Sequence, residues 1–460
     1  MSDAKRTSRR SGSSPLRPVL GMKRFLLLFV ACALALAQSG PALSTSYNFP
    51  GSNGAPTDLN GWMGGVTNFL LGTNLQVALL FLHNPVNVLT GTYTGCTAGS
   101  GSGCVKGNAR TGTDGTWSSG NTFTAASLNA TSADTGKSIW ITERNLDTIG
   151  TQFSGTVTFV NSTTLTLSAT PSFSGSMTNA YWVLGVDDGT NLTNAIASGD
   201  IFIPAGTYLT QNSINITTNY HNIQCADNAI LITPHHGSGG SAVFSLTGAS
   251  YNSIIGCNIQ GSNVPINGST APGYDINNEF DIPVYIKSGS NNNFFAGNHF
   301  AYSWGNSEFL VTCGTACSGG NSNTIVNNWF EQGGHYCWSI SEGNNNIFEY
   351  NKMVDCDSGS EGNPGDPTNG SLNTGNIFAY NKLLCVNGDR GTSGQGCMYL
   401  TGGNAAGVNY GGNQVFNNQL SGCGSLTCSG GSSGIRILEA NAPGPAVYTN
   451  NQCGSGCSVH

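Results

Sequence analysis

Five segments in the second half of the chain share one alternation of polar and apolar positions. Each begins with an asparagine, continues with a short apolar strand, and then has a second asparagine, one variable residue and one apolar residue. The second asparagines lie 30, 23, 30 and 37 residues apart, which is the period range of solenoids, where each coil buries its apolar face only against its neighbour. The pattern predicts a stack of short strands over residues 293–300, 323–330, 346–353, 376–383 and 413–420.

The register also predicts which side chains point into the coils. The second asparagine of each segment is expected to form an internal ladder, because side-chain amides stacked at about 4.8 Å can hydrogen-bond to one another. We interpret this ladder as structural rather than catalytic. Two apolar positions are expected to form further internal ladders: Phe295, Ile325, Phe348, Phe378 and Val415 at one, and Phe300, Phe330, Met353, Leu383 and Leu420 at the other.

The variable position is filled by His299, Trp329, Lys352, Lys382 and Gln419. Such chemical variety at one register predicts exposure to solvent. Lysines on neighbouring coils would repel each other, and an anionic ligand would relieve that repulsion. The first four residues are therefore candidates for substrate binding; the alternative is a solvated edge with flexible lysine side chains.

Residues 187–209 carry a helix signal followed by a strand signal. They read Asp-Asp-Gly-Thr-Asn-Leu-Thr-Asn-Ala-Ile-Ala-Ser-Gly-Asp-Ile-Phe-Ile-Pro-Ala-Gly-Thr-Tyr-Leu. Asp188 or Thr190 can cap a short helix on which Leu192, Ala195 and Ile196 share one face, and residues 201–203 then form a buried strand. A helix in this place would cover the open end of the first coil.

This stretch resembles the opening of pectate-lyase-like right-handed parallel β-helix proteins, which include polysaccharide lyases, polygalacturonase-type hydrolases and phage tailspikes. The resemblance covers residues 186–460 and implies an all-β fold: a right-handed parallel β-helix (solenoid) with a short N-terminal capping helix. It implies the fold more strongly than any one reaction.

Residues 45–185 are predicted to form a small β-rich module before the solenoid. Segments 137–142, 155–160 and 164–168 alternate between apolar and polar residues, and Gly, Ser and Asn separate them, as in half-buried antiparallel strands. The apolar stretch 69–82 is interrupted by Asn74 and Gln76, so we predict no membrane span there.

Residues 1–44 are interpreted as a leader and signal peptide. Lys23 and Arg24 precede an apolar run over 25–37 that ends in Ala-Leu-Ala, the small-residue pattern of a signal peptidase site. A lipid anchor at Cys32 is the alternative, although it would cut the apolar run in half. These features predict a secreted, extracellular protein.

Composition agrees with an exported β-solenoid. Charged residues make up 8% of the chain, against 38% apolar residues and 65 glycines, which disfavours long helices but supplies a core. Seven of the 16 basic and one of the 23 acidic residues lie in 1–37. The remainder carries a net charge of −13, so we expect no binding to nucleic acid.

Fourteen cysteines follow the leader, an even number that predicts structural disulfides in an exported chain. A zinc site would require finger-like spacing, which the intervening Gly-Ser runs do not resemble. Four close pairs are expected to staple loops: Cys96 with Cys104, Cys313 with Cys317, Cys423 with Cys428, and Cys453 with Cys457. Six others are candidates to bridge neighbouring coils: Cys225, Cys257, Cys337, Cys356, Cys385 and Cys397.

Acidic residues concentrate in the middle coils. Glu331 lies three residues after Asn328 and Asp355 four after Asn351, so we expect the two on adjacent coils near the same side. Glycoside hydrolysis needs two carboxyl groups about 5 to 9.5 Å apart, a separation that stacking can supply. The predicted catalytic set is Glu331, His335, Asp355 and Asp357, with Tyr302 and Trp304 as aromatic substrate contacts.

Two alternatives stand beside this prediction. The acids could instead cap turns or bind Ca²⁺ in the loop between 355 and 366, although no metal ligand is assigned. A lyase would need a base together with Arg, Lys or Ca²⁺ to neutralise a uronic acid carboxylate, and the predicted β-helix has only Arg390 and Arg436, in later coils. The Gly-His-Gly motif of polygalacturonases is not matched, since Tyr336 follows His335.

The sequence thus favours a secreted carbohydrate-active enzyme that cleaves an acidic polysaccharide by elimination or hydrolysis. The alternative is a non-catalytic extracellular β-helix that binds glycans or serves as an adhesin. The substrate, the linkage, a dependence on Ca²⁺ and the oligomeric state are left open.

Overall fold

The computed structural model describes most of the chain after residue 84. The leader and the first part of the N-terminal module therefore lie outside the described residues. These residues are 85–145, 148–173, 175–233, 242–261, 282–287, 289–303, 307–311, 320–331, 336–340, 343–354, 360–362, 373–384, 398–401, 410–411, 413–421, 434–438, 447–453 and 458–459.

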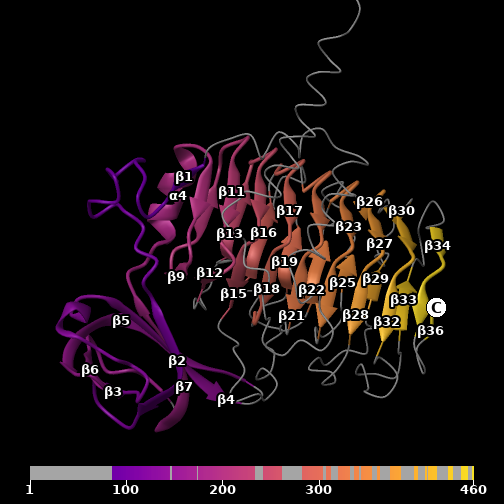
Figure 1. Ribbon diagram of the computed structural model, residues 1–460. Helices are drawn as coiled ribbons and strands as arrows, with labels where there is room; N and C mark the ends of the chain where they lie inside the picture. Colours follow the sequence, from indigo (N-terminus) through magenta and orange to yellow (C-terminus); the bar gives the residue numbers. More distant parts are fainter. Residues whose placement is uncertain are drawn as a thin grey trace, which may run out of the picture. The chain divides into compact units, whose positions relative to one another are not determined.

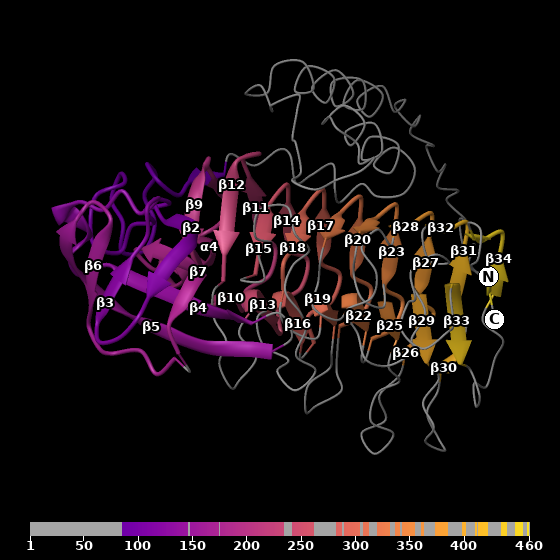
Figure 2. The ribbon, with the colours of Figure 1, turned by 90° about the horizontal axis from the view of Figure 1, so that it is seen from below.

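Three parallel sheets, visited in turn by the chain, form a parallel β-helix, as predicted (Figures 1 and 2). Every strand pairs with the strand one coil later, so each sheet runs along the stack. We call the sheets A, B and C in the order in which each coil enters them. Sheet A consists of β1 (Val86–Asn87), β8 (Ile201–Ile203), β11 (Asn222–Cys225), β14 (Ser253–Ile255), β17 (Phe294–Ala296), β20 (Thr324–Val326), β23 (Ile347–Glu349), β27 (Ile377–Ala379), β31 (Gln414–Phe416) and β34 (Val447–Thr449).

Sheets B and C continue each coil. Sheet B consists of β9 (Gly206–Leu209), β12 (Ala229–Ile232), β15 (Asn258–Gln260), β18 (His299–Ala301), β21 (Trp329–Glu331), β24 (Lys352–Val354), β28 (Lys382–Leu384), β32 (Gln419–Ser421) and β35 (Gln452–Cys453). Sheet C consists of β10 (Ile214–Ile216), β13 (Ala242–Thr247), β16 (Ile282–Lys287), β19 (Ser307–Val311), β22 (Tyr336–Ile340), β25 (Ser360–Gly362), β29 (Met398–Thr401), β33 (Gly434–Leu438) and β36 (Ser458–Val459). Two short strands, β26 (Asn373–Thr374) and β30 (Tyr410–Gly411), pair outside these sheets.

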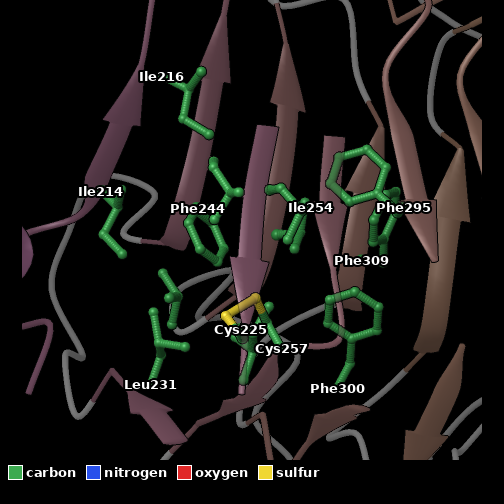
Figure 3. Close-up of a cluster of buried hydrophobic side chains, with 14 of the residues drawn as sticks. Ile214, Ile216, Cys225, Leu231, Phe244, Ile254, Cys257, Phe295, Phe300 and Phe309 are labelled. Atoms are coloured by element: carbon green, nitrogen blue, oxygen red, sulfur yellow. A yellow bond between two sulfur atoms is a disulfide. The ribbon is translucent and has the colours of Figure 1, made fainter. Parts of the chain in front are cut away.

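The predicted apolar ladders fill the interior of the coils. Phe348 pairs in register with Ile325 before it and Phe378 after it, and all three are buried. Trp338 from sheet C stacks on Phe348, with ring centroids 4.1 Å apart. Figure 3 shows the same packing in earlier coils, where Phe295 and Phe300 surround Phe309. The short strands are stable because each coil buries its apolar residues against the next one.

The predicted asparagine ladder is present where each coil turns from sheet A to sheet B. The Asn328 amide donates to Oδ1 of Asn351 at 3.1 Å, and its own Oδ1 accepts the backbone N–H and the side-chain amide of Asn298 at 3.0 Å. These bonds satisfy buried backbone groups that no strand partner reaches. A second asparagine ladder, not predicted from the sequence, precedes sheet A and contains Asn252, Asn293, Asn323, Asn346, Asn376 and Asn413.

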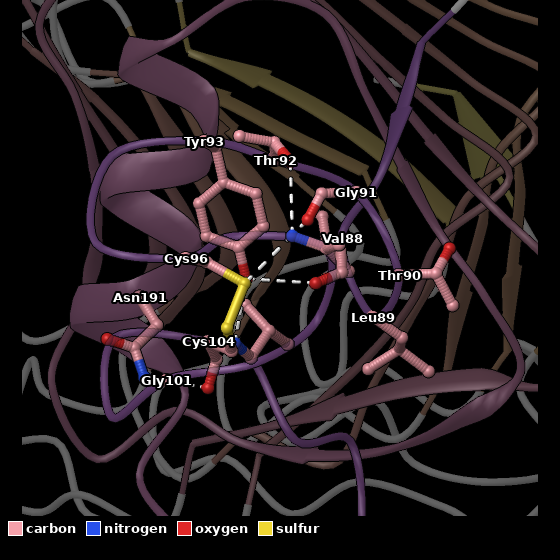
Figure 4. Close-up of a disulfide and its surroundings, with 12 residues drawn as sticks. Val88, Leu89, Thr90, Gly91, Thr92, Tyr93, Cys96, Gly101, Cys104 and Asn191 are labelled. Atoms are coloured by element: carbon pink, nitrogen blue, oxygen red, sulfur yellow. Dashed lines mark hydrogen bonds between the residues drawn. A yellow bond between two sulfur atoms is a disulfide. The ribbon is translucent and has the colours of Figure 1, made fainter.

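Two disulfides join parts of the described chain. Cys96 bonds to Cys104, as predicted, and this loop lies against α4 through a hydrogen bond from Asn191 to the Cys104 carbonyl (Figure 4). Cys225 bonds to Cys257 and bridges neighbouring coils, also as predicted (Figure 3). Cys337 is disulfide-bonded as well. The remaining predicted pairs include residues outside the described part of the chain.

The capping helix α4 (Gly189–Ala197) covers the first coil with Leu192, Ala195 and Ile196, the three residues predicted to share its buried face. Asp188 is its N-cap residue, but no helical N–H binds the side chain. Its carboxylate instead accepts the backbone N–H groups of Lys106 and Gly107. Burial raises the pKa of Asp188 to about 6, against the lowering effect of these hydrogen bonds.

The segment before the barrel packs with the first coil of the β-helix. β1 pairs with β8 and extends sheet A, and Val88 and Tyr93 belong to the same core cluster as Leu192 of α4. This part of the predicted N-terminal module therefore contributes to the first coil of the β-helix. The two residues of β1 are too few to show a strand pattern in the sequence.

The remainder of the module is a closed antiparallel barrel. It contains β2 (Arg110–Trp117), β3 (Thr122–Thr124), β4 (Ser138–Asn145), β5 (Thr148–Asn161), β6 (Thr164–Leu167) and β7 (Met177–Gly185), with the 3-10 helix η1 (Ser132–Asp134) between β3 and β4. Trp140 and Tyr181 of the barrel pack against Leu209 and Ile232, which lie on sheet B. In the described part of the chain, no helix is long and apolar enough to cross a bilayer.

Candidate functional site

The outer face of sheet B gathers the chemically reactive side chains of the middle coils. Phe300, Phe330 and Met353, the central residues of β18, β21 and β24, lie in the core, so the residues on either side of them point outward. His299, Trp329 and Lys352 pair in register on this face, followed by Lys382. This confirms the predicted column and its order.

The predicted solvent exposure of this column is wrong for its first three members. His299 is 2% exposed, Trp329 4% and Lys352 7%, whereas Lys382 and Gln419 are exposed. The three buried side chains contact one another: the His299 and Trp329 rings have centroids 5.5 Å apart, and Nζ of Lys352 lies 4.6 Å from the centre of a Trp329 ring.

A histidine and a carboxylate form the centre of the site. Nε2 of His299 lies 3.1 Å from Oε2 of Glu331 on the next coil, and both side chains are buried. Because Glu331 pairs with Ala301, the contact runs diagonally between β18 and β21. A histidine oriented by a carboxylate can accept or donate a proton through its ring nitrogens.

The positively charged side chain of Lys352 is buried near this pair. Its Nζ makes no hydrogen bond within the described residues. Burial lowers the pKa of Lys352 to about 8; the Lys382 charge on the next coil adds to that effect and the Glu331 charge opposes it. An ammonium group that is buried without a hydrogen bond is stabilised by an anion placed against it.

The other predicted site residues divide into two groups. Tyr302 follows β18 and is buried, with its backbone N–H donating to the Glu331 carbonyl at 3.1 Å. Its aromatic ring is therefore not an exposed sugar contact. Trp304, His335, Asp355 and Asp357 lie outside the described residues, so their assignments stay predictions. The described residues contain no cluster of three or more His, Cys, Asp or Glu side chains placed to hold a metal ion.

Two exposed tyrosines at the edge of sheet B were missed in the sequence. Tyr350 and Tyr380 occupy the turn between sheets A and B, two residues before Lys352 and Lys382. Their rings stack with centroids 4.8 Å apart and planes 3° apart. The signal was present, because Tyr-Asn-Lys occurs at the same register in two successive segments.

Comparison with solved structures finds other proteins at low identity. A catalytic domain of a GH87 α-1,3-glucanase in complex with tetrasaccharides is 12% identical, with a TM-score of 0.40, over 75% of this chain and 67% of that one. An alginate lyase from Paenibacillus sp. is 14% identical, with a TM-score of 0.32, over 58% and 97%. PfbA, a surface adhesin of Streptococcus pneumoniae, is 12% identical, with a TM-score of 0.30, over 58% and 86%. No protein-family profile and no curated protein matches the sequence.

Proposed function

We propose that this protein is a secreted carbohydrate-active enzyme that cleaves an acidic polysaccharide on the outer face of sheet B. The observation that carries the proposal is the His299–Glu331 contact of 3.1 Å, beside the buried ammonium group of Lys352. Lys352 has a lowered pKa, and titratable groups with perturbed pKa values are concentrated at functional sites. Lys352 and Lys382 favour an anionic substrate over a neutral one.

These groups supply what elimination from a uronic acid polymer requires. His299, held by Glu331, would take the proton from the carbon that bears the carboxylate. The electrons of that C–H bond form a double bond as the bond to the glycosidic oxygen breaks, and the leaving oxygen takes up the proton from the His299 imidazolium. Lys352 and Lys382 would stabilise the negative charge that develops on the carboxylate. Hydrolysis would need a second carboxylate, for which Asp355 and Asp357 remain candidates.

Incubation with polygalacturonate, alginate and a neutral β-glucan tests the proposal. Elimination is expected to produce ends that absorb in the ultraviolet from one of the two acidic polymers, and hydrolysis would release reducing ends without that absorbance. Cleavage of the neutral polymer alone would contradict the choice of substrate class. The absence of any product from the three would contradict an enzymatic role on them.

Burial of the reacting groups favours a second candidate function. Glu331 is fully buried and His299 is 2% exposed, whereas a catalytic group must touch its substrate. A protein that binds an acidic glycan without cleaving it needs only the cationic and aromatic surface. Saturable binding in the same panel, without products, would support this glycan-binding or adhesin role.

Affinity for an acidic polymer should decrease as the pH rises above about 8. Below that pH Lys352 is an ammonium group, and above it the free protein loses that charge. Once Lys352 is neutral, the affinity for the polymer should fall almost tenfold per pH unit, because Lys352 must then take up a proton when the polymer binds. Binding of polygalacturonate between pH 6 and 10, measured by calorimetry, checks this expectation.

Two lysine variants separate this effect from general electrostatics. Lys352→Met should bind more weakly at pH 7 and lose the transition near pH 8. Lys287→Met is the matched control, because Lys287 also lies over an aromatic ring, 4.7 Å from the centre of Tyr285, but on sheet C. An unchanged transition in Lys352→Met would assign the effect to another group.

A further inference from the structure

The turn from sheet A to sheet B repeats along the stack with one backbone conformation. The residue before each ladder asparagine has a positive φ, and in most coils it is Gly or Asn: Gly297, Asn327, Asn417 and Asn450. Glycine and asparagine are the residues that adopt this left-handed conformation with least strain. We call this column of turn residues the A–B corner.

Two successive coils depart from that preference. Tyr350 and Tyr380 occupy the A–B corner with φ of 57° each. Their side chains are 49% and 40% exposed, so burial in the core does not explain them. Residues held in an unfavourable backbone conformation at an exposed position are candidates for a functional role.

The surroundings of the two rings indicate what they bind. Lys352 and Lys382 lie two residues further along each coil, on the outer face of sheet B, and Lys382 is exposed. Beyond Tyr380 the corner residues become smaller, and the surface there has a shallow hollow of about 460 Å³. It is lined by Tyr380, Asn417, Gln419, Asn450, Asn451 and Gln452.

We propose that the A–B corner from Tyr350 to the hollow binds a stretch of acidic polysaccharide lying along the axis of the stack. The exposed tyrosine rings supply rigid contact area for sugar rings, and their hydroxyls are hydrogen-bonding groups. Lys382 attracts the carboxylates, and the amides of the hollow bond to sugar hydroxyls. The inference shares its ligand class and Lys382 with the proposed function but uses neither His299 nor Glu331, so it holds equally for a protein that binds without cleaving.

A second tyrosine pair provides a matched control. Tyr220 and Tyr251 also have positive φ, stack with centroids 5.0 Å apart, and are 72% and 39% exposed. They precede sheet A rather than sheet B and are followed by His221 and Asn252, without a lysine two residues on. If any exposed tyrosine stack bound glycan, the two pairs would behave alike.

The test replaces both corner tyrosines by the residue that other coils already use. Tyr350→Asn with Tyr380→Asn should keep the fold, with a thermal midpoint within a few degrees of the parent, because asparagine suits the turn. All variants carry Glu331→Gln so that cleavage does not remove the ligand. Affinity for polygalacturonate or alginate oligosaccharides, measured by calorimetry, is expected to fall about tenfold, equal to about 1.4 kcal/mol. Tyr220→Asn with Tyr251→Asn should leave that affinity unchanged.

A third variant keeps the test decisive if the tyrosine pair proves necessary for folding. Gln452→Ala removes one amide of the hollow and leaves both rings in place, and binding is expected to weaken about threefold, as for one lost hydrogen bond. Unchanged affinity in the corner variants, an equal loss in the control pair, or no binding of either acidic probe by the parent would overturn the proposal. If the native chain binds the polymer without cleaving it, the binding proposal is supported and the catalytic proposal is contradicted.

Discussion

Replacing Glu331 by glutamine is expected to lower the rate of polysaccharide cleavage by about 10²–10⁴-fold. The carboxylate lies 3.1 Å from Nε2 of His299 and would stabilise the imidazolium that forms when this histidine takes a proton. Glutamine has the same shape but carries no charge, so the orientation of the ring is kept while that stabilisation is lost. The measurement is the initial rate of product formation on the cleaved polymer, across a range of pH and substrate concentration.

The carboxylate of Glu349 offers a matched control for this variant. It lies on sheet A, one coil after Glu331, and burial raises its pKa. Because Glu349 lies on a different sheet from His299 and Glu331, Glu349→Gln should retain the parent rate. His299→Gln should lose activity to the same degree as Glu331→Gln, and the double variant should lose little more, because the two groups act as a unit. A folded Glu331→Gln protein with the parent rate would remove the pair from the mechanism.

The ladders of the β-helix could be predicted because stacking imposes one environment on each register position. Phe348 lies three residues before Asn351, as Phe378 lies three before Asn381 one coil later, in an almost identical context. A position that is apolar in all five segments is expected to face the core, because burial there stabilises an apolar side chain in every coil. The same argument was available for the first asparagine of each segment, which forms the second ladder.

The burial of the sheet B column could not be predicted in this way. Chemical variety at His299, Trp329 and Lys352 predicts exposure only if each side chain is considered within its own coil. The structure instead pairs His299 with Glu331 diagonally across coils, and places Lys352 over the Trp329 ring. Such contacts depend on side-chain rotamers and on the offset between neighbouring strands. Neither can be predicted from the repeat period.

The tyrosines of the A–B corner were missed for a different reason. Their register position was assigned to the apolar strand, and a tyrosine there resembles an ordinary strand residue. Only the positive φ of Tyr350 and Tyr380 shows that the strand has already ended. A turn position is usually marked in the sequence by Gly or Asn, and neither residue occupies it in these two coils.

Replacing Asn328 by leucine is expected to lower the free energy of unfolding by about 2–6 kcal/mol, since two buried backbone groups lose their partners at about 1–3 kcal/mol each. The Asn328 side chain accepts the backbone N–H of Asn298 at 3.0 Å and donates to the Phe295 carbonyl at 3.0 Å. Leucine fills a similar volume but satisfies neither group. Chemical denaturation followed by circular dichroism, with hydrogen exchange at the Asn298 amide, measures the change.

Asn327→Gly is the control for this variant, because the two asparagines are neighbours with opposite roles. Asn327 has a φ of 53° in the A–B corner and is half-buried, whereas Asn328 is 2% exposed. Glycine adopts that φ without strain, so its effect on stability should remain within about 1 kcal/mol. If Asn328→Leu were equally mild, hydrophobic stacking alone would hold the coils together. A selective loss would instead show that satisfying buried backbone groups at each turn is what makes the short strands of this β-helix stable.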